Sequence, residues 1–166
     1  MPHRAFIGVG SNLGDRVANI NESIDKLLET PETRIVRLSS FYESEPHGDA
    51  KTWFVNAVME IETEFKSTDF LKKLKAIEKA MGRKRVRGKK WGSRIIDLDI
   101  LFFDQEISNT RTLKLPHPRI AERRFVLLPL AEVAPQMNHP VLSQTISQIL
   151  AGTLDRKRVS LLPPGS

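Results

Sequence analysis

The sequence contains no cysteine, so disulfide bonds and thiolate metal sites are excluded. It also has no apolar run that approaches the roughly 20 residues of a membrane-spanning helix. The first residues lead directly into an apolar segment at Ala5, without the pattern of a signal peptide. A chain without cysteine is compatible with a reducing compartment. We therefore expect a cytoplasmic protein that has no membrane partner.

Acidic residues are absent from Gly82 to Arg94, which reads GRKRVRGKKWGSR and carries seven lysine and arginine residues. The whole chain has a formal net charge of +6, and much of this excess lies in that one stretch. A local positive excess favours an anionic partner, either a nucleic acid or a phosphorylated small molecule.

The rest of the composition is ordinary for a globular protein. Hydrophobic residues make up 40% and charged residues 28% of the chain, so disorder is not indicated. A length of 166 residues fits one domain with a sizeable core. We find no internal repeat, low-complexity segment or linker, and we expect a single domain over residues 1–166.

Hydrophobic periodicity predicts the main elements. Strands are expected at 5–9, 34–42, 53–65 and 91–103, with one helix after Asp15 and another capped by Ser67 or Thr68. Shorter elements are expected beyond them: a strand at 113–115, a helical turn at 121–124 and a helix at 143–150, before a loose tail. The order strand, helix, strand, strand, helix, strand is the split βαβ pattern. It predicts an α+β fold, with both helices on one face of a mostly antiparallel sheet and a C-terminal extension.

Three glycines near the N-terminus, Gly8, Gly10 and Gly14, have the spacing GxGxxxG. This spacing matches neither the dinucleotide-binding nor the P-loop pattern. We interpret residues 10–14 as a strand-to-helix turn.

Two carboxylates interrupt the apolar strand at 91–103. Side chains alternate between the faces of a strand, so Asp97 and Asp99 share one face. The other face is wholly apolar and is expected to carry Ile96, Leu98, Ile100 and Phe102. Carboxylates about 7 Å apart can reach one hard cation or a pair of cations. The alternative is that they are surface charges or pair with nearby lysine and arginine.

Phe54 and Asn56 lie side by side on the less apolar face of the strand at 53–65. A ring beside an amide suits a flat heterocycle, which the ring can stack on and the amide can hydrogen-bond. The alternative is a half-exposed phenylalanine next to an asparagine near a turn. If both strand predictions hold, Asp97 and Asp99 lie on the same side of the same sheet as this pair.

Paired carboxylates, a basic segment and the lack of a candidate covalent nucleophile together suggest phosphoryl-type transfer. Mg²⁺ held by the two aspartates would bridge phosphate oxygens. Arg83, Arg85 and Arg94 would bind the remaining phosphate oxygens in bidentate fashion.

Two other classes of protein share some of these features. A nucleic-acid-binding protein would use the basic run for phosphates and Phe54 and Phe125 for base stacking, but it leaves Asp97 and Asp99 unexplained. A two-metal nuclease or phosphatase does explain the aspartates.

Six stretches distributed along most of the chain carry a resemblance: GVGSNLGD at 8–15, SSFYESEPHG at 39–48, WFVNAV at 53–58, IEKAMGRKR at 77–85, WGSRIIDLDILFF at 91–103 and LPHPRIAERRFVLLPLAEVAP at 115–135. In these stretches the chain resembles the 6-hydroxymethyl-7,8-dihydropterin pyrophosphokinase family of folate biosynthesis. The patterns WG-x-R-x-x-DLDI and PHPR-x-x-E-R-x-F are the most specific.

The resemblance implies a ferredoxin-like βαββαβ sandwich. It implies that the β,γ-pyrophosphate of ATP moves to the hydroxymethyl oxygen of the pterin and that AMP is released. Two Mg²⁺ ions would lie between Asp97 and Asp99 and the triphosphate, with Arg83 and Arg85 as further catalytic residues. A monomer that binds these two small molecules and no nucleic acid is the family expectation.

The resemblance also implies the binding residues. For the pterin these are Phe54 and Phe125 as enclosing rings, with Ser44, His47, Asn56 and Trp91 around them. For ATP they are Lys75, Glu78, Arg85, Trp91, Arg94, Ile100, His117 and Arg123. The chain departs from the family pattern at Glu45, Lys75 and Pro118, and an apparently longer segment after Gly82 allows Arg87 to take the place of Arg85.

Overall fold

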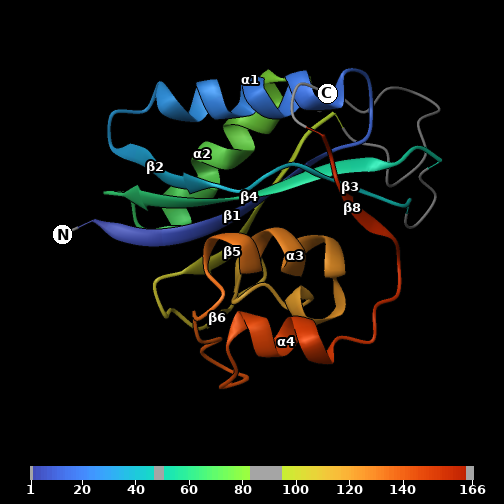
Figure 1. Cartoon of the computed structure of the whole chain (residues 1–166). Coiled ribbons are helices and arrows are strands. Elements are labelled where there is room, and N and C mark those ends of the chain that lie inside the picture. Colours follow the sequence, from blue (N-terminus) through green and yellow to red (C-terminus); the bar gives the residue numbers. More distant parts are fainter. Residues whose placement is uncertain (1, 47–50, 83–94, 164–166) are drawn as a thin grey trace.

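An antiparallel sheet forms the middle layer of the fold in the computed structural model, which describes residues 2–46, 51–82 and 95–163 (Figure 1). The six strands of this sheet in the described part of the chain are β1 (His3–Ser11), β2 (Thr33–Leu38), β3 (Tyr42–Ser44), β4 (Phe54–Thr63), β5 (Asp97–Phe103) and β8 (Val159–Leu161). Their order is β5-β1-β4-β3-β8, and β2 also pairs with β4. Every pair is antiparallel, as the split βαβ pattern predicts.

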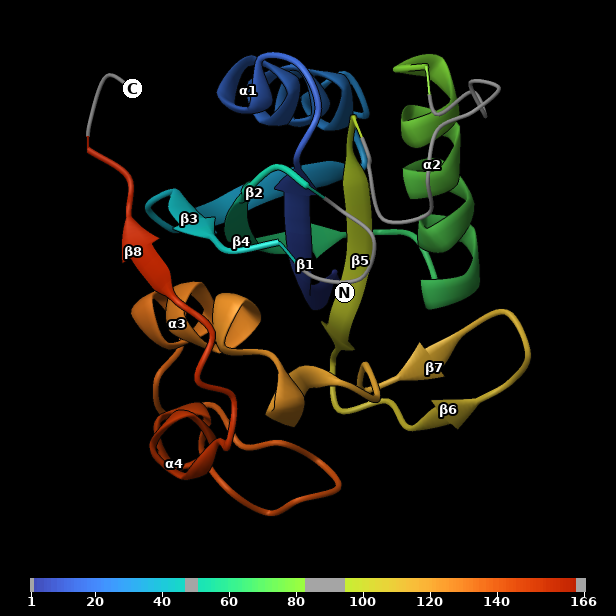
Figure 2. The same cartoon turned by 90° about the vertical axis from the view of Figure 1, so that its right-hand side faces the viewer.

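Helices cover both faces of the sheet (Figures 1 and 2). On one face lie α1 (Arg16–Leu28) and α2 (Ser67–Ala80), the two helices that the periodicity predicts. On the other side lie α3 (Arg124–Val133) and α4 (Ile146–Gly152). The one-turn helix η1 (Ile120–Glu122) and the two-stranded ribbon of β6 (Ser108–Asn109) and β7 (Lys114–Leu115) complete the fold. Among the described residues, no helix combines the length and the apolar character that a membrane crossing requires.

Each side of the sheet has its own apolar core. The core under α1 and α2 contains Ile7, Val55, Met59, Phe70 and Leu74 among its fully buried residues. The core under α3 and α4 contains Phe6, Val58, Phe102, Leu127 and Leu130. The C-terminal extension is therefore a third layer, which buries a second apolar face of the sheet.

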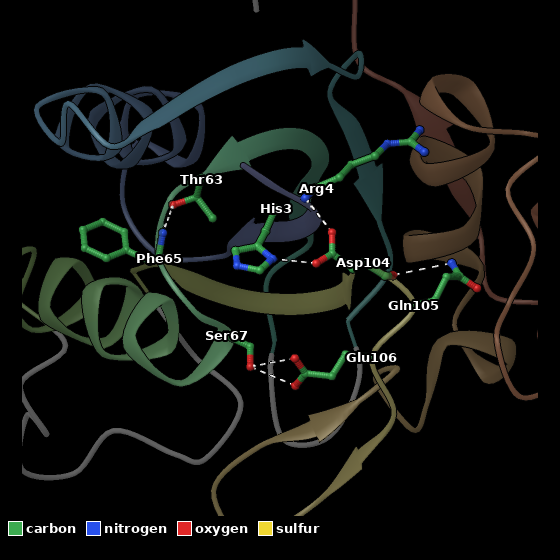
Figure 3. A network of polar contacts seen from close by, with 8 residues as sticks. All are labelled: His3, Arg4, Thr63, Phe65, Ser67, Asp104, Gln105 and Glu106. Atoms are coloured by element: carbon green, nitrogen blue, oxygen red, sulfur yellow. Dashed lines mark hydrogen bonds and ion pairs between the residues drawn. The ribbon is translucent and has the colours of Figure 1, made fainter. Parts of the chain in front are cut away.

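The two predicted helices begin and end close to the expected residues. Asp15 caps α1 by accepting a hydrogen bond from the Ala18 N–H at 3.1 Å. Gly82 follows α2 with a φ of +85°, a left-handed conformation that favours glycine. The predicted cap of α2 is wrong, because Lys66 precedes the helix and Ser67 is its first residue. The Ser67 hydroxyl donates to the Glu106 carboxylate at 2.8 Å instead (Figure 3).

A bulge in β5 changes the predicted alternation. Ile7 of β1 faces Ile100, but the preceding Phe6 faces Phe102, so Leu101 is an extra residue in β5. Phe102 therefore lies in the core under α3 and α4, and the prediction that it shares a face with Ile100 is wrong. The next residue, Phe103, lies in the core under α1 and α2.

Two other predicted boundaries also differ. The strand β1 continues through Ser11, so Gly10 belongs to the sheet rather than to a turn. The strand expected at 34–42 is broken into β2 and β3, both of which pair with β4.

After residue 120, the predicted helical turn and the helix expected at 143–150 correspond to η1 and α4, but α3 and β8 were not predicted. Pro129 lies inside α3, where a proline removes one helical hydrogen bond. Burial of Val126, Leu127 and Leu130 against the sheet offsets that loss. The predicted loose tail is preceded by β8, which extends the sheet beyond β3.

Asp104 fixes one end of the sheet (Figure 3). Its carboxylate accepts a hydrogen bond from the Arg4 N–H at 2.8 Å and contacts His3 Nδ1 at 2.7 Å. These contacts join the start of β1 to the end of β5. The opposite end of the same strand pair carries Gly10 and Asp97.

Candidate active site

A pocket with about 600 Å³ of empty space, its open mouth included, lies on the side of the sheet that carries α3. Its floor comes from β1, β5 and the middle of β4. One wall comes from η1, α3 and the segment before them, and the start of β4 at Phe54 forms the opposite wall. The lining includes seven of the residues that the sequence indicated as site residues: Phe54, Asn56, Asp97, Asp99, His117, Arg123 and Phe125. The structure thus brings together side chains from four separate parts of the chain.

Two glycines of β1 form the floor between the polar side chains. In the sheet, Gly10 lies between Asn56 of β4 and Asp97 of β5, and Gly8 lies between Val58 and Asp99. A Cβ atom at Gly10 would lie only 2.8 Å from Asn56 Oδ1. Sequence reasoning placed Gly8 in the strand at 5–9 and Gly10 in a strand-to-helix turn, whereas both belong to β1. Two glycines spaced by two residues in a strand leave one face of that strand without side chains, and this spacing was the available signal.

The two aspartates project into the pocket because of the alternation in β5. Leu98, which lies between them, is 2% exposed and belongs to the core on the opposite face. Asp97 is half-buried and Asp99 is exposed. This part of β5 precedes the bulge, so the predicted face of both carboxylates is correct.

Glu78 of α2 holds the backbone between the two aspartates from the other side of the sheet. Its side chain is buried and accepts a hydrogen bond from the Leu98 N–H at 3.0 Å. Lys75 lies 3.4 Å from the same carboxylate. Ile100 is also buried in the core under α1 and α2. These three residues do not line the pocket, and the ATP contacts that the resemblance implies for them stay predictions.

Phe54 and Asn56 are both buried, with 4% and 6% exposure, so the alternative of a half-exposed ring is wrong. The Asn56 Nδ2 group donates a hydrogen bond to Ser44 Oγ at 2.7 Å. Ser44 is 1% exposed and lies on β3, next to β4. The Asn56 amide is therefore held in one orientation by a neighbouring strand. Phe125, the second residue of α3, is half-buried on the other side of the pocket.

His117 and Arg123 form the side of the pocket that can donate hydrogen bonds to an anion. Burial lowers the pKa of His117, against the opposing effect of Asp99, and the positive charges of Arg123 and Arg119 lower it further. His117 Nδ1 accepts a hydrogen bond from the Arg119 N–H at 3.2 Å, so the neutral ring carries its proton on Nε2. Burial also lowers the pKa of Arg123, again opposed chiefly by Asp99. The Arg123 guanidinium lies 5.7 Å from the centre of the Phe125 ring.

Five residues that the sequence indicated lie outside the described residues. They are His47, Arg83, Arg85, Trp91 and Arg94. The alternative position for Arg85, Arg87, lies outside them as well.

The donor set of the pocket suits Mg²⁺ that arrives with a phosphate ligand. Within residues 2–46, 51–82 and 95–163, no group of three or more His, Asp or Glu side chains could hold a metal ion alone. Mg²⁺ is commonly held by one or two carboxylates, with phosphate oxygens and water completing the octahedron. Asp97 and Asp99 fit that role, and His117 and Arg123 add groups that can bind anions. This pocket suits the transfer of a phosphoryl group to a flat substrate, because carboxylates can hold Mg²⁺, a guanidinium can bind phosphate and phenyl rings can stack on a heterocycle.

Comparison with known proteins identifies the family. Residues 6–135 match the family model described as 7,8-dihydro-6-hydroxymethylpterin-pyrophosphokinase (HPPK). The chain belongs to this family.

Several curated relatives are similar over nearly their whole length, and each bears the name 2-amino-4-hydroxy-6-hydroxymethyldihydropteridine pyrophosphokinase. The protein of Methylorubrum extorquens is 40% identical over 149 residues, which cover 89% of this chain and 92% of the relative. The protein of Aquifex aeolicus is 38% identical over 144 residues, which cover 86% and 88%. The protein of Haemophilus influenzae is 38% identical over 160 residues, which cover 96% and 98%.

Solved structures bear out the fold. The chain superimposes on the HPPK-DHPS structure of Plasmodium falciparum with pteroate at a TM-score of 0.73 and 17% identity, over 91% of this chain. A second HPPK-DHPS structure, in complex with substrates, gives a TM-score of 0.72 at 16% identity. The chain spans 41% and 43% of the length of these two chains. At this identity the likeness concerns the α+β fold alone.

Proposed function

We propose that this protein transfers the β,γ-pyrophosphate group of ATP to the hydroxymethyl oxygen of 6-hydroxymethyl-7,8-dihydropterin. The products are AMP and the pterin diphosphate, and the reaction is a step of folate biosynthesis. The observation that carries the proposal is the pocket of a family member in which Phe54, Asn56 and Phe125 lie beside Asp97 and Asp99. The names of the curated relatives support the same reaction.

The pterin would bind between Phe54 and Phe125. Flat heterocycles stack on phenyl rings, and a buried amide supplies hydrogen bonds that select one edge of the ring system. The bond from Asn56 to Ser44 supports this role, because it orients the amide before the substrate arrives. Orientation in advance lowers the entropic cost of binding. His47 and Trp91 would add contacts around the pterin.

The triphosphate would bind over Asp97 and Asp99. These carboxylates would hold two Mg²⁺ ions, which neutralise phosphate charge and orient the phosphate oxygens when bound. The Nε2–H group of His117 and the Arg123 guanidinium can donate hydrogen bonds to the same oxygens. Arg83, Arg85, Trp91 and Arg94 are the further ATP-side residues we propose, together with Lys75, Glu78 and Ile100.

The protein would act mainly by positioning the two substrates. The pterin hydroxyl oxygen would attack the β-phosphorus of ATP and give up its proton to solvent. The bond from that phosphorus to the α–β bridging oxygen would break, and AMP would leave with that oxygen and its electron pair. No covalent bond to the protein is needed, since the pterin supplies the attacking oxygen. Asp97 would lie on the side of the pterin hydroxyl. We propose a monomer, following the family resemblance.

Production of AMP from Mg-ATP, with and without 6-hydroxymethyl-7,8-dihydropterin, tests the function. We expect AMP only when the pterin is present, in equal amount with pterin diphosphate. AMP formation that does not depend on the pterin would contradict the proposal. Cleavage of a polynucleotide in the presence of a divalent metal alone would favour the nuclease alternative.

A further inference from the structure

The segment between α4 and β8 contacts the supports of both walls of the pocket from outside. Residues 153–158, here called the C-terminal strap, run from α4 past α3 to the outer edge of the sheet at β8 (Figure 2). None of these residues lines the pocket. Their contacts nevertheless end on residues that neighbour pocket side chains in the sequence.

One set of contacts holds the wall that carries Arg123 and Phe125. Asp155 Oδ2 accepts a hydrogen bond from the Arg124 N–H at 2.8 Å. Arg124 begins α3, and the residue before it provides no side-chain cap for the helix. Asp155 therefore satisfies an N-terminal amide of α3 from 31 positions away in the sequence, and its charge lies at the positive end of the helix.

Two more bonds reinforce this wall. The Thr153 hydroxyl donates to the Ala121 carbonyl of η1 at 2.8 Å. The Lys157 carbonyl accepts a hydrogen bond from Arg124 Nη1 at 3.3 Å. Asp155 Oδ1 accepts from the Lys157 N–H at 3.0 Å, so the same carboxylate orders the strap itself.

A second set of contacts holds the wall that carries Ser44 and Phe54. The Arg158 N–H donates to Glu45 Oε1 at 2.8 Å, and the Glu45 N–H donates to the Arg158 carbonyl at 3.1 Å. The Arg158 guanidinium lies 5.3 Å from the centre of the Trp53 ring. Trp53 precedes the pocket residue Phe54, and Glu45 follows Ser44, which holds the pocket residue Asn56, so the strap contacts the sequence neighbours of both.

We propose that the C-terminal strap sets the separation of the two pocket walls, and that Asp155 is a positioning residue for Phe125. This inference rests on the proposed function, in which the pterin binds between Phe54 and Phe125. A ring bound between two others requires carbon contacts of about 3.5–4.0 Å on both of its faces. The attraction falls steeply when one contact opens by an ångström. Without the Asp155 cap, the first turn of α3 frays and Phe125 no longer meets the second face of the ring.

The test compares Asp155→Ala with Lys157→Ala. The control removes an exposed side chain from the same strap and keeps the backbone bonds of Lys157. In the protein without ligand, we expect faster hydrogen exchange at the amides of Arg124–Leu127 in Asp155→Ala only. With 6-hydroxymethyl-7,8-dihydropterin, we expect this variant to bind about fivefold more weakly, the scale of a lost helix cap. The KM for the pterin should rise accordingly, while kcat at saturating pterin stays within about twofold.

Equal exchange and equal pterin affinity in folded Asp155→Ala and wild type would overturn the inference, as would an equal effect of Lys157→Ala. If Asp155→Ala does not fold, Asp155→Asn replaces it in the test. The two carboxylate oxygens of Asp155 accept from the Arg124 and Lys157 amides, and asparagine has only one side-chain oxygen. In that variant pterin affinity should fall only if exchange at Arg124 becomes faster. Faster exchange with unchanged affinity, or weaker affinity with unchanged exchange, would overturn the inference. The exchange measurement needs no substrate, so it remains informative if wild type fails to bind the pterin, a result that would refute the proposed function instead.

Discussion

Replacing Gly10 with alanine is expected to damage the pterin side of the pocket. The added Cβ atom would lie 2.8 Å from Asn56 Oδ1, whereas ordinary contacts begin at 3.4 Å. The Asn56 amide must therefore move by about 0.6 Å. It is 6% exposed and bonded to Ser44 Oγ at 2.7 Å, so a shift of this size stretches or bends that bond inside a packed environment.

The size of the effect follows from two opposing contributions. A buried polar group that loses its partner costs about 1–3 kcal/mol. Replacing glycine with alanine also restricts the unfolded chain, which returns about 0.4–1 kcal/mol. We expect a net loss of about 1–2 kcal/mol in the free energy of unfolding. A displaced amide should weaken pterin binding by a similar free energy, which is about 5- to 30-fold in Kd.

Gly8→Ala is the matched control for folding. It adds the same methyl group to the same face of β1, two residues away, where the nearest atom is Leu101 Cδ2 at 3.4 Å. We expect its free energy of unfolding to stay within about 1 kcal/mol of wild type, and the reduced entropy of the unfolded chain favours a small gain. Urea unfolding of both variants and pterin titrations of Gly10→Ala measure these quantities. A Gly10→Ala variant that is as stable as Gly8→Ala and keeps wild-type pterin affinity would refute the reasoning.

Three further predictions concern other parts of the site and its support. Asp97→Asn and Asp99→Asn should each lower the rate of AMP formation by orders of magnitude with an unchanged circular dichroism spectrum, because a metal ligand is lost; near-normal turnover would contradict the metal role. Phe125→Ala should weaken pterin binding by about 1–3 kcal/mol, the scale of stacking on an aromatic side chain, and equal affinity in a direct titration would count against the two-ring arrangement. Tyr42 is the only tyrosine in the sequence, and burial together with its 2.6 Å hydrogen bond to Glu132 raises its pKa from 10.0 to about 12. The unfolded state then loses its proton first, so stability should fall as the pH rises from 10.0 to about 12, and Glu132→Gln should bring the absorbance titration closer to the ordinary value.

The order of strands and helices was predictable because periodicity survives wherever one face of an element is buried. The alternation in β4 and the first half of β5 correctly placed Asn56 and Asp97 on one side of one sheet. It failed at Phe102, because a bulge is a backbone irregularity that alternation alone does not reveal. The family resemblance supplied the roles that side-chain patterns left open between a kinase, a nuclease and a nucleic-acid-binding protein.

The walls of the pocket were harder to predict than its floor. Pro129 is a local sign against a helix, and only the burial of α3 on the sheet overrides it. Asp155 and Arg124 are bonded across 31 positions, a separation that no local pattern reports. The glycines at 8 and 10 show a different limit: their meaning depends on Asn56 and Asp97, which reach them only through strand pairing.

The pairing of Gly10 with both Asn56 and Asp97 fixes the distance between these two residues. Neighbouring strands lie about 4.8 Å apart, so the backbones of Asn56 and Asp97 are separated by about 9.6 Å across β1. If the proposed function holds, one end of this interval selects the pterin edge and the other receives the oxygen that accepts the pyrophosphate. Backbone hydrogen bonds determine the interval, and side-chain substitutions leave it unchanged. Substitutions in the pocket can therefore change which substituents of a substrate are accepted. The distance between the recognised edge and the reacting oxygen is harder to change.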